Sequence, residues 1–232
     1  MIAAPWEKRI ARAAELEKAC PPAAELLRFY RHIAEFLATV SQPVQLEPLL
    51  RLVAREGPDA LAQVAEALLA TPVRWSEAVQ APATPAESFF PRVIQQANQE
   101  ALARRNSVLR DSVQPICPFC GSKPLVAILR PEGEGGKRSL LCGVCFTEWD
   151  FRRLFCPNCG EEDKDKLPVY TAQEFPHIRV EACDSCRVYI KSVDLTRNGL
   201  AVPEVDELAS IALDLWAAEN GYTKLQTNLF AL

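Results

Sequence analysis

Four cysteine pairs with the spacing Cys-x-x-Cys constrain this chain more than any other feature of its sequence. Eight of its nine cysteines fall within a stretch of 70 of the 232 residues. Two thiolates in one tight backbone turn reach a metal ion from the same side, and two such turns complete a tetrahedral all-sulfur site, which zinc and iron both favour. The sequence therefore predicts two metal sites. Their eight ligands are Cys117, Cys120, Cys142, Cys145, Cys156, Cys159, Cys183 and Cys186.

The cysteine-rich stretch is an internal repeat. Residues 116–121 (Ile-Cys-Pro-Phe-Cys-Gly) match residues 155–160 (Phe-Cys-Pro-Asn-Cys-Gly), and the second cysteine pair of each half recurs at a similar offset. Each copy has a cysteine turn, a β-hairpin pattern and a second cysteine turn; the hairpins are expected at 126–141 and 169–181. A unit of about 35 residues buries too little apolar surface to fold unaided, so a metal is expected to stabilise it. We expect sequential pairing, with one ion in each copy, rather than an interleaved cross-brace.

Disulfide bonds and a redox-active dithiol are the competing interpretations of the cysteine pairs. The N-terminus becomes charged at Glu7 and shows no export signal, so the thiols are expected to be reduced, as in a cytoplasm. A redox dithiol at Cys117 and Cys120 would need a helix to begin at its first cysteine, whereas Gly121 and Pro124 follow at once. The spacing also differs from the compact cysteine run of ferredoxins. A metal-binding turn is therefore favoured, and its spacing does not separate iron from zinc.

Charge and hydropathy argue against several classes of function. The formal net charge is −4, and residues 117–191 contain 11 Lys/Arg and 11 Asp/Glu, to which each site with four thiolates adds negative charge. A surface that binds nucleic acid needs the opposite balance. No apolar run approaches the ~20 residues of a membrane-spanning helix. The sequence has no nucleophile–base pairing, phosphate loop or dinucleotide motif, so the chain is not expected to be an enzyme.

Residues 1–111 carry the pattern of an all-helical domain, with apolar residues three and four positions apart. The sequence Cys-Pro-Pro at 20–22 separates the first two helices, and Gly57 with Pro58 separates the third from the fourth. Later helices of the chain are expected at 45–55, from 59 onward, near Trp75, at 91–110, and from Pro203 to an Asn-Gly stop at 220–221.

The remaining candidate residues are expected to have structural roles. Cys20 is expected to be a small core residue, and His177 is not expected to bind a metal because the cysteines already complete both sites. Glu148, Trp149 and Arg153 are expected to brace the segment that joins the two halves of the repeat.

Five stretches of this sequence together resemble the FdhE family of formate dehydrogenase accessory proteins. Order, spacing and flanking residues agree from about Ile116 to the C-terminus, whereas residues 1–111 share only helical character and look shorter than in familiar family members. The matching stretches are 141–149 (Leu-Cys-Gly-Val-Cys-Phe-Thr-Glu-Trp), 153–160 (Arg-x-x-Cys-Pro-Asn-Cys-Gly), 181–191 (Glu-Ala-Cys-Asp-Ser-Cys-Arg-Val-Tyr-Ile-Lys), 206–214 (Asp-Glu-Leu-Ala-Ser-Ile-Ala-Leu-Asp) and 219–222 (Glu-Asn-Gly-Tyr).

The resemblance implies a cytoplasmic assembly factor that is needed for active respiratory formate dehydrogenase and that binds the catalytic subunit of that enzyme. It also implies two rubredoxin-like modules with iron on the eight paired cysteines, zinc being the alternative metal. Rubredoxin-type sites often have glycine after both cysteine pairs, whereas Phe146 and Arg187 follow the second pair in each half here. The oligomeric state stays open, and a homodimer is among the expected partnerships.

The expected fold class is α+β, with a C-terminal helix that packs on the body. Two other functions stay open from the residues alone: a rubredoxin-like electron-transfer protein, and a zinc-ribbon nucleic-acid-binding protein, which the charge disfavours. The expected divisions are a helical domain at 1–111, tandem rubredoxin-like or zinc-ribbon modules at 112–150 and 151–196, and the C-terminal helix and tail at 197–232.

Overall fold

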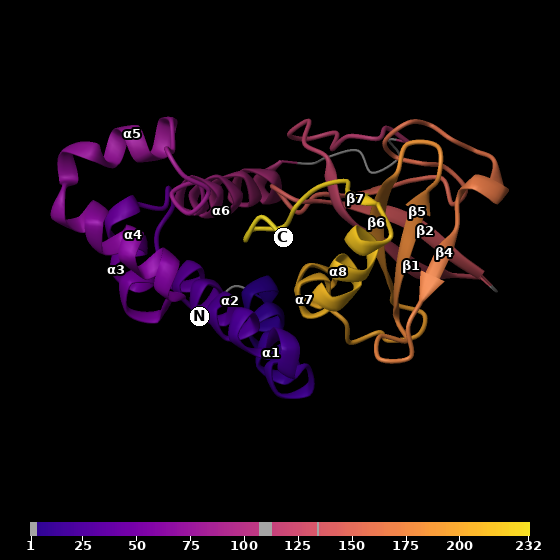
Figure 1. Ribbon diagram of the computed structural model, residues 1–232, viewed down its shortest axis with the longest axis horizontal. Coiled ribbons are helices and arrows are strands. Elements are labelled where there is room, and N and C mark those ends of the chain that lie inside the picture. The colour runs from indigo at the N-terminus through magenta and orange to yellow at the C-terminus, as the bar shows by residue number, and fades with distance from the viewer. Residues whose placement is uncertain (1–3, 107–112, 134) are drawn as a thin grey trace.

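A computed structural model describes residues 4–106, 113–133 and 135–232 of the chain. A helical N-terminal part lies beside a β-sheet, and two helices from the C-terminal segment lie between them (Figure 1). This arrangement confirms the expected fold class, in which a helical region is followed by a sheet with two groups of four cysteines and then by helix. None of the helices in the described ranges is long and apolar enough to cross a membrane.

The N-terminal helices begin and end close to the breaks that the positions of proline and glycine predict. The 3₁₀ turn Pro21–Ala23 separates the first two helices, and Gly57 with Pro58 separates the third from the fourth. The predicted residues 107–110 of the last of these helices, and the domain boundary at 111–112, lie outside the described residues. The helices are α1 (Ala4–Ala19), α2 (Ala24–Thr39), α3 (Leu46–Glu56), α4 (Asp59–Ala70), α5 (Trp75–Gln80) and α6 (Phe89–Arg105).

The core of the helical part includes residues from the other end of the chain. Apolar side chains on α1 to α6 form one buried cluster, which includes Leu27, Leu49 and Phe90. Val205 and Leu208 of helix α7 (Pro203–Ala209) belong to the same cluster. The C-terminal segment therefore completes the hydrophobic core of the N-terminal helices.

Within the described residues, seven strands form one continuous sheet with the order β3-β2-β1-β6-β5-β4, and β7 pairs with β6. The two predicted hairpins are confirmed as the antiparallel pairs β1–β2 and β4–β5. The two halves of the repeat join through a parallel pair, in which Val126 of β1 lies beside Lys191 of β6. The strands are β1 (Pro124–Glu132), β2 (Gly135–Cys142), β3 (Glu148–Asp150), β4 (Val169–Thr171), β5 (Ile178–Cys183), β6 (Val188–Asp194) and β7 (Thr223–Lys224).

The two faces of the sheet are buried against different parts of the molecule. On one face, Ile178 and Val180 pack against Leu213 and Ala217 of helix α8 (Ile211–Glu219). We call this the helix face. On the other, which we call the cysteine face, Ala127, Leu140 and Trp149 cluster with Cys117, Cys142 and Cys145. Side chains alternate between faces along a strand, so β6 supplies Tyr189 to the first cluster and Ile190 to the second.

The predicted helix from Pro203 to the Asn-Gly stop begins and ends where expected, but it divides at Ser210 into α7 and α8. The backbone carbonyl oxygen of Glu207 accepts a hydrogen bond of 2.6 Å from the ammonium of Lys191. That ammonium also lies within 3.4 Å of the Ser210 carbonyl oxygen. A buried cation on the sheet therefore binds the carbonyl groups at the point where the two helices separate.

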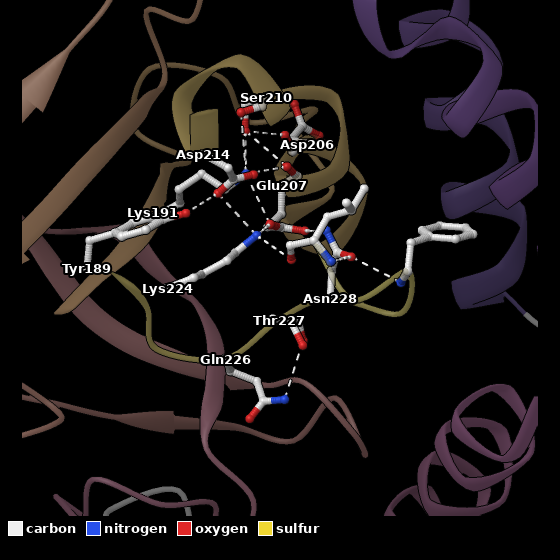
Figure 2. A network of polar contacts seen from close by, with 12 residues as sticks. Tyr189, Lys191, Asp206, Glu207, Ser210, Asp214, Lys224, Gln226, Thr227 and Asn228 are labelled. Carbon is white, nitrogen blue, oxygen red and sulfur yellow. Dashed lines mark hydrogen bonds and ion pairs between the residues drawn. The ribbon is translucent and has the colours of Figure 1, made fainter. Parts of the chain in front are cut away.

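Figure 2 shows the ammonium groups of Lys191 and Lys224 pointing toward the carboxylates of Glu207 and Asp214. Lys191 is fully buried, and its Nζ lies 3.0 Å from Glu207 and 2.7 Å from Asp214. Burial by itself raises the pKa of Glu207, but the two lysines outweigh it, so this pKa lies below its usual value. Two cations matched by two anions thus fix α7 and α8 on the helix face.

Candidate metal centres

The first group of cysteines gathers at the end of the hairpin β1–β2. Cys117 and Cys120 precede β1, whereas Cys142 ends β2 and Cys145 follows it, so the hairpin brings the two pairs together. The four Sγ atoms all lie within 4.8 Å of one another. Cys117 Sγ is 3.5 Å from Cys145 Sγ, and Cys120 Sγ is 3.4 Å from Cys142 Sγ.

The second group repeats this arrangement at the end of β5, before β6 begins. Cys156 Sγ is 3.8 Å from Cys186 Sγ, and Cys159 Sγ is 3.7 Å from Cys183 Sγ. A metal–sulfur distance of ~2.3 Å in a tetrahedron gives sulfur–sulfur edges of about 3.8 Å. The second group therefore has the spacing of a tetrahedral thiolate site, and the first is slightly tighter. The predicted sequential pairing is confirmed, and the cross-brace does not occur among the described residues.

The same backbone turn follows the first cysteine pair in each half. Gly121 N donates to the Cys117 carbonyl oxygen at 2.9 Å, and Gly160 N donates to that of Cys156 at 3.0 Å. Both glycines have a positive φ, of 73° and 79°. Such a φ is the left-handed conformation that glycine adopts without a steric penalty, so glycine suits this turn.

The second pair in each half is followed by the same conformation without glycine. Phe146 has a φ of 54° and Arg187 has a φ of 58°. The departure from the rubredoxin pattern therefore concerns the side chain and leaves the backbone turn unchanged. A left-handed residue with a β-carbon costs about 1–2 kcal/mol.

Both of these side chains make contacts that offset this cost. The ring of Phe146 lies against the guanidinium of Arg9 on α1, 4.3 Å from the ring centre. The guanidinium of Arg187 lies 4.0 Å from the centre of the Tyr222 ring and donates to the carbonyl oxygen of Asn220 at 2.6 Å. Each turn is thus attached to a distant segment of the chain.

Backbone N–H groups and one hydroxyl surround the sulfur atoms. Cys142 Sγ accepts from Val144 N at 3.3 Å, and Cys156 Sγ accepts from Asn158 N at 3.4 Å. Thr147 Oγ1 lies 3.1 Å from Cys145 Sγ, where its hydroxyl can donate to a thiolate. Such donors stabilise a negative charge on sulfur and so favour the form that binds a metal.

Four sulfur atoms this close do not ionise independently without a cation. In the first group, hydrogen bonds from Cys142 and Cys145 lower the pKa of Cys117 to about 2. The hydrogen bond with Cys117 is the main reason that the pKa of Cys142 lies far above its usual value, and it raises that of Cys145 to about 12. A divalent ion must therefore displace protons to bind, which makes loading dependent on pH.

The two groups differ in their exposure to solvent. Cys117, Cys142 and Cys145 are buried in the cluster on the cysteine face, and Cys120 is partly exposed. In the second group Cys159 is exposed and Cys186 is partly exposed. Both groups offer four sulfur donors and fit either zinc or iron, because both ions accept tetrahedral thiolate ligands.

The expected brace between the two halves is only partly correct. Trp149 is fully buried and donates to the Gln114 carbonyl oxygen at 2.8 Å, and Glu148 accepts two hydrogen bonds of 2.7 Å from Arg130. Arg153, by contrast, is exposed and has no hydrogen bond or ion pair in the part of the chain that the structure describes. The prediction for Arg153 is therefore wrong.

Arg138 joins the two halves in its place. Its guanidinium is buried, donates to the Arg152 carbonyl oxygen at 2.8 Å, and contacts Glu181 Oε2 at 2.7 Å. Sequence reasoning missed this residue because a single arginine in a strand carries no local signal. Its role depends on Glu181 of β5, which only the tertiary structure places within reach.

The other two candidates have structural contacts. Cys20 is partly buried and packs against the helical core, as expected of a small apolar residue. His177 Nε2 lies 2.7 Å from Asp206 Oδ1, and that carboxylate also accepts from Arg12 at 2.5 Å. His177 therefore contributes to the contact between α1, α7 and the start of β5.

Comparison with known proteins gives a consistent result. Residues 116–153 match the model of the FdhE central domain, and residues 155–231 match that of the FdhE C-terminal domain. A protein FdhE homolog of Aquifex aeolicus is 44% identical over 113 residues, which cover 48% of this chain and 40% of that protein. One from Pseudomonas aeruginosa is 35% identical over 132 residues, covering 53% and 41%. The matched part of the chain thus covers only about two fifths of the length of each of these relatives.

The fold has a counterpart in a crystal structure of the FdhE protein from Pseudomonas aeruginosa. The TM-score is 0.75 at 24% sequence identity, and the match covers 97% of this chain and 95% of the other. This likeness extends the agreement in fold to the helical part, which neither domain model reaches. With both FdhE domain models matching the region that holds all eight paired cysteines, the chain belongs to the FdhE family.

Proposed function

We propose that this protein is a metal-containing accessory factor for the maturation of formate dehydrogenase, that it is not an enzyme, and that it binds the catalytic subunit of formate dehydrogenase in the cytoplasm. The observation that supports this most is the pair of four-cysteine groups within domains of the FdhE family. The family name connects that pair with formate dehydrogenase.

A non-catalytic role fits the chemistry of the two groups. Catalytic metal sites keep one coordination position open for water or substrate, whereas four thiolates close a tetrahedral site. Each group would hold one ion on its four cysteines, with iron favoured by the family resemblance and zinc as the alternative. When bound, the ions would cross-link turns that are too small to fold alone.

The test is capture of the catalytic subunit by the metal-loaded full chain. Cys117→Ser with Cys120→Ser removes half of the first group, and Cys156→Ser with Cys159→Ser removes half of the second. Cys20→Ser is the matched control, because Cys20 lies in the helical part, away from both groups. Each double variant is expected to lose one metal ion by element analysis and to capture less subunit than the control.

Undiminished capture by both double variants would contradict a role of the metal modules in the partnership. Failure of the unaltered protein to capture the subunit would contradict the proposed function itself. Element analysis of protein purified without oxygen decides between iron and zinc.

An electron-transfer role is the second candidate, because Cys159 places one sulfur of the second group at the surface. A rubredoxin-like carrier requires iron that is reduced and reoxidised reversibly. A zinc-loaded protein that supports full formate dehydrogenase maturation would exclude this candidate.

A further inference from the structure

A cavity of about 440 Å³ opens on the cysteine face of the sheet, beside the second cysteine group. Leu129 of β1 and Val188 and Ile190 of the adjacent strand β6 line it, together with Phe155 and Pro157 from the segment that joins the two halves. Volumes of this size with mainly apolar linings are typical of binding sites.

Two exposed hydrophobic residues, Leu154 and Val169, line this cavity. Leu154 of the joining segment is 57% exposed, and Val169 of β4 is 54% exposed. Both line the cavity and both face solvent, so an occupant that fills the hollow alone leaves their outer surfaces in water. Covering them requires a larger partner, such as a segment of another protein chain.

Of the three arginines among the described residues that line the cavity, two are paired with carboxylates and one is not. Arg138 is neutralised by Glu181, which its guanidinium contacts at 2.7 Å, and Arg179 pairs with Asp194. Arg153 also lines the cavity, and its guanidinium has no acidic partner among the described side chains. A free guanidinium beside apolar surface favours a ligand with a carboxylate next to its apolar group.

Strand β4 offers a backbone edge beside the same cavity. It is the last strand of the sheet, and no described strand pairs with its outer side. Val169 lies opposite Glu181 of β5 in the register, so both belong to the face on which the cavity opens. An extended segment that adds to an edge strand presents alternate side chains to one face of the sheet.

From these observations we infer that the cavity binds an extended segment of a partner protein, with an apolar side chain in the hollow and an acidic side chain on Arg153. The inference rests on the proposed function, because the partner is the formate dehydrogenase catalytic subunit. Cys156 and Cys183 line the cavity, so the bound segment touches two cysteines of the second metal group.

The first test measures binding of the catalytic subunit to the metal-loaded full chain. Arg153→Glu and Leu154→Ser change exposed side chains on the cavity and are expected to weaken binding at least tenfold. Arg51→Glu and Leu200→Ser are matched controls, because both residues are exposed on other parts of the chain. The controls are expected to bind as the unaltered protein does.

The outcomes separate the inference from the function on which it rests. If the unaltered protein binds the subunit and both cavity variants bind equally well, the inference is overturned and the proposed function stands. If the unaltered protein does not bind at all, the proposed function fails and the inference fails with it.

A second test uses the contact with the metal group. Overlapping peptides of the catalytic subunit are titrated into the cobalt-loaded full chain, and the thiolate-to-cobalt absorption is recorded. A peptide with adjacent apolar and acidic residues is expected to shift this absorption, and replacement of its acidic residue by alanine is expected to abolish the shift. A response to octanoate and to none of the peptides would make the cavity a small-molecule site and overturn the inference.

Discussion

The guanidinium of Arg9 lies 4.3 Å from the centre of the Phe146 ring, so the first helix of the chain contacts the turn that completes the first cysteine group. Arg9 is buried and also donates to Glu100 of α6 at 2.9 Å and to Glu204 of α7 at 2.5 Å. Burial alone lowers the pKa of Arg9, but these two carboxylates outweigh it and raise the pKa above its usual value. One cation thus connects α1, α6, α7 and the metal-binding turn.

Replacement of Arg9 by leucine is expected to destabilise the protein by about 3–5 kcal/mol, because it leaves buried carboxylates without a cation. Urea denaturation of the metal-loaded chain, followed by circular dichroism, measures the change. Arg51→Ala is the control, since its pair with Glu47 is exposed and such pairs contribute less than about 1 kcal/mol. Equal effects of the two substitutions would show that Arg9 does not have this connecting role.

Phe146→Gly is expected to be more stable than Phe146→Ala by about 1 kcal/mol. Both variants lose the contact with Arg9, but only alanine keeps a β-carbon at the positive φ. The converse change, Gly121→Ala, should cost a similar amount, because no atom lies within 4 Å of the added β-carbon and only the backbone conformation opposes it. Thermal denaturation of the three variants measures both effects, and a more stable Phe146→Ala would refute the explanation.

The second cysteine group is expected to release its metal to a chelator before the first. Cys159 is exposed, whereas three cysteines of the first group are buried, so ligands and protons reach the second group more easily. Native mass spectrometry during incubation with a chelator would show an intermediate with one ion.

The double variants assign that remaining ion. A protein with Cys117→Ser and Cys120→Ser keeps only the second group and should lose its ion quickly, whereas Cys156→Ser with Cys159→Ser should retain its ion longer. The reverse order of release would mean that exposure does not control metal loss.

The ionised carboxylate of Asp206 is expected to stabilise the folded protein, and this contribution is expected to be lost in acid. Burial raises the pKa of Asp206, but hydrogen bonds from His177 and Arg12 outweigh it, so this pKa is lower in the folded protein than in the unfolded chain. A lowered folded pKa gives stability above the unfolded value of ~3.9, and that stability is lost as pH falls through the folded pKa. The stability difference between the natural protein and Asp206→Asn should therefore shrink below about pH 4.

The measurement compares unfolding of the two proteins from pH 3 to pH 6 at equal metal loading, so that the pH dependence of metal binding is shared. Glu66→Gln, which alters an exposed carboxyl on α4, is the control and should show no such convergence. A difference that stays constant across this range would rule out a role for Asp206 ionisation.

Local features of the sequence were enough to predict the two cysteine groups and their order. Cys117 and Cys120 lie in one turn, and the hairpin β1–β2 returns the chain to Cys142 over a short distance. The breaks at Pro21 and Gly57 were likewise predictable, because proline and glycine restrict the backbone wherever they stand.

Features that depend on distant contacts were not predictable from the residues that form them. At the division of the C-terminal helix at Ser210, the ammonium of Lys191 contacts the carbonyl oxygens of Glu207 and Ser210 from strand β6, which is distant in the sequence. The prediction that Arg153 braces the two halves failed for a similar reason. Arg138 fills this role, and it reaches Glu181 only once β2 and β5 have joined one sheet.

The sequence by itself determined that two groups of four thiolates form, because each depends on turns and hairpins whose parts are close along the chain. Tertiary structure alone decided that β1 pairs with β6, that α7 completes the core of the N-terminal helices, and that Leu154, Val169 and Arg153 line one cavity. These relations join segments far apart in the sequence. Their energies come from burial and charge pairing between surfaces that exist only once the chain has folded.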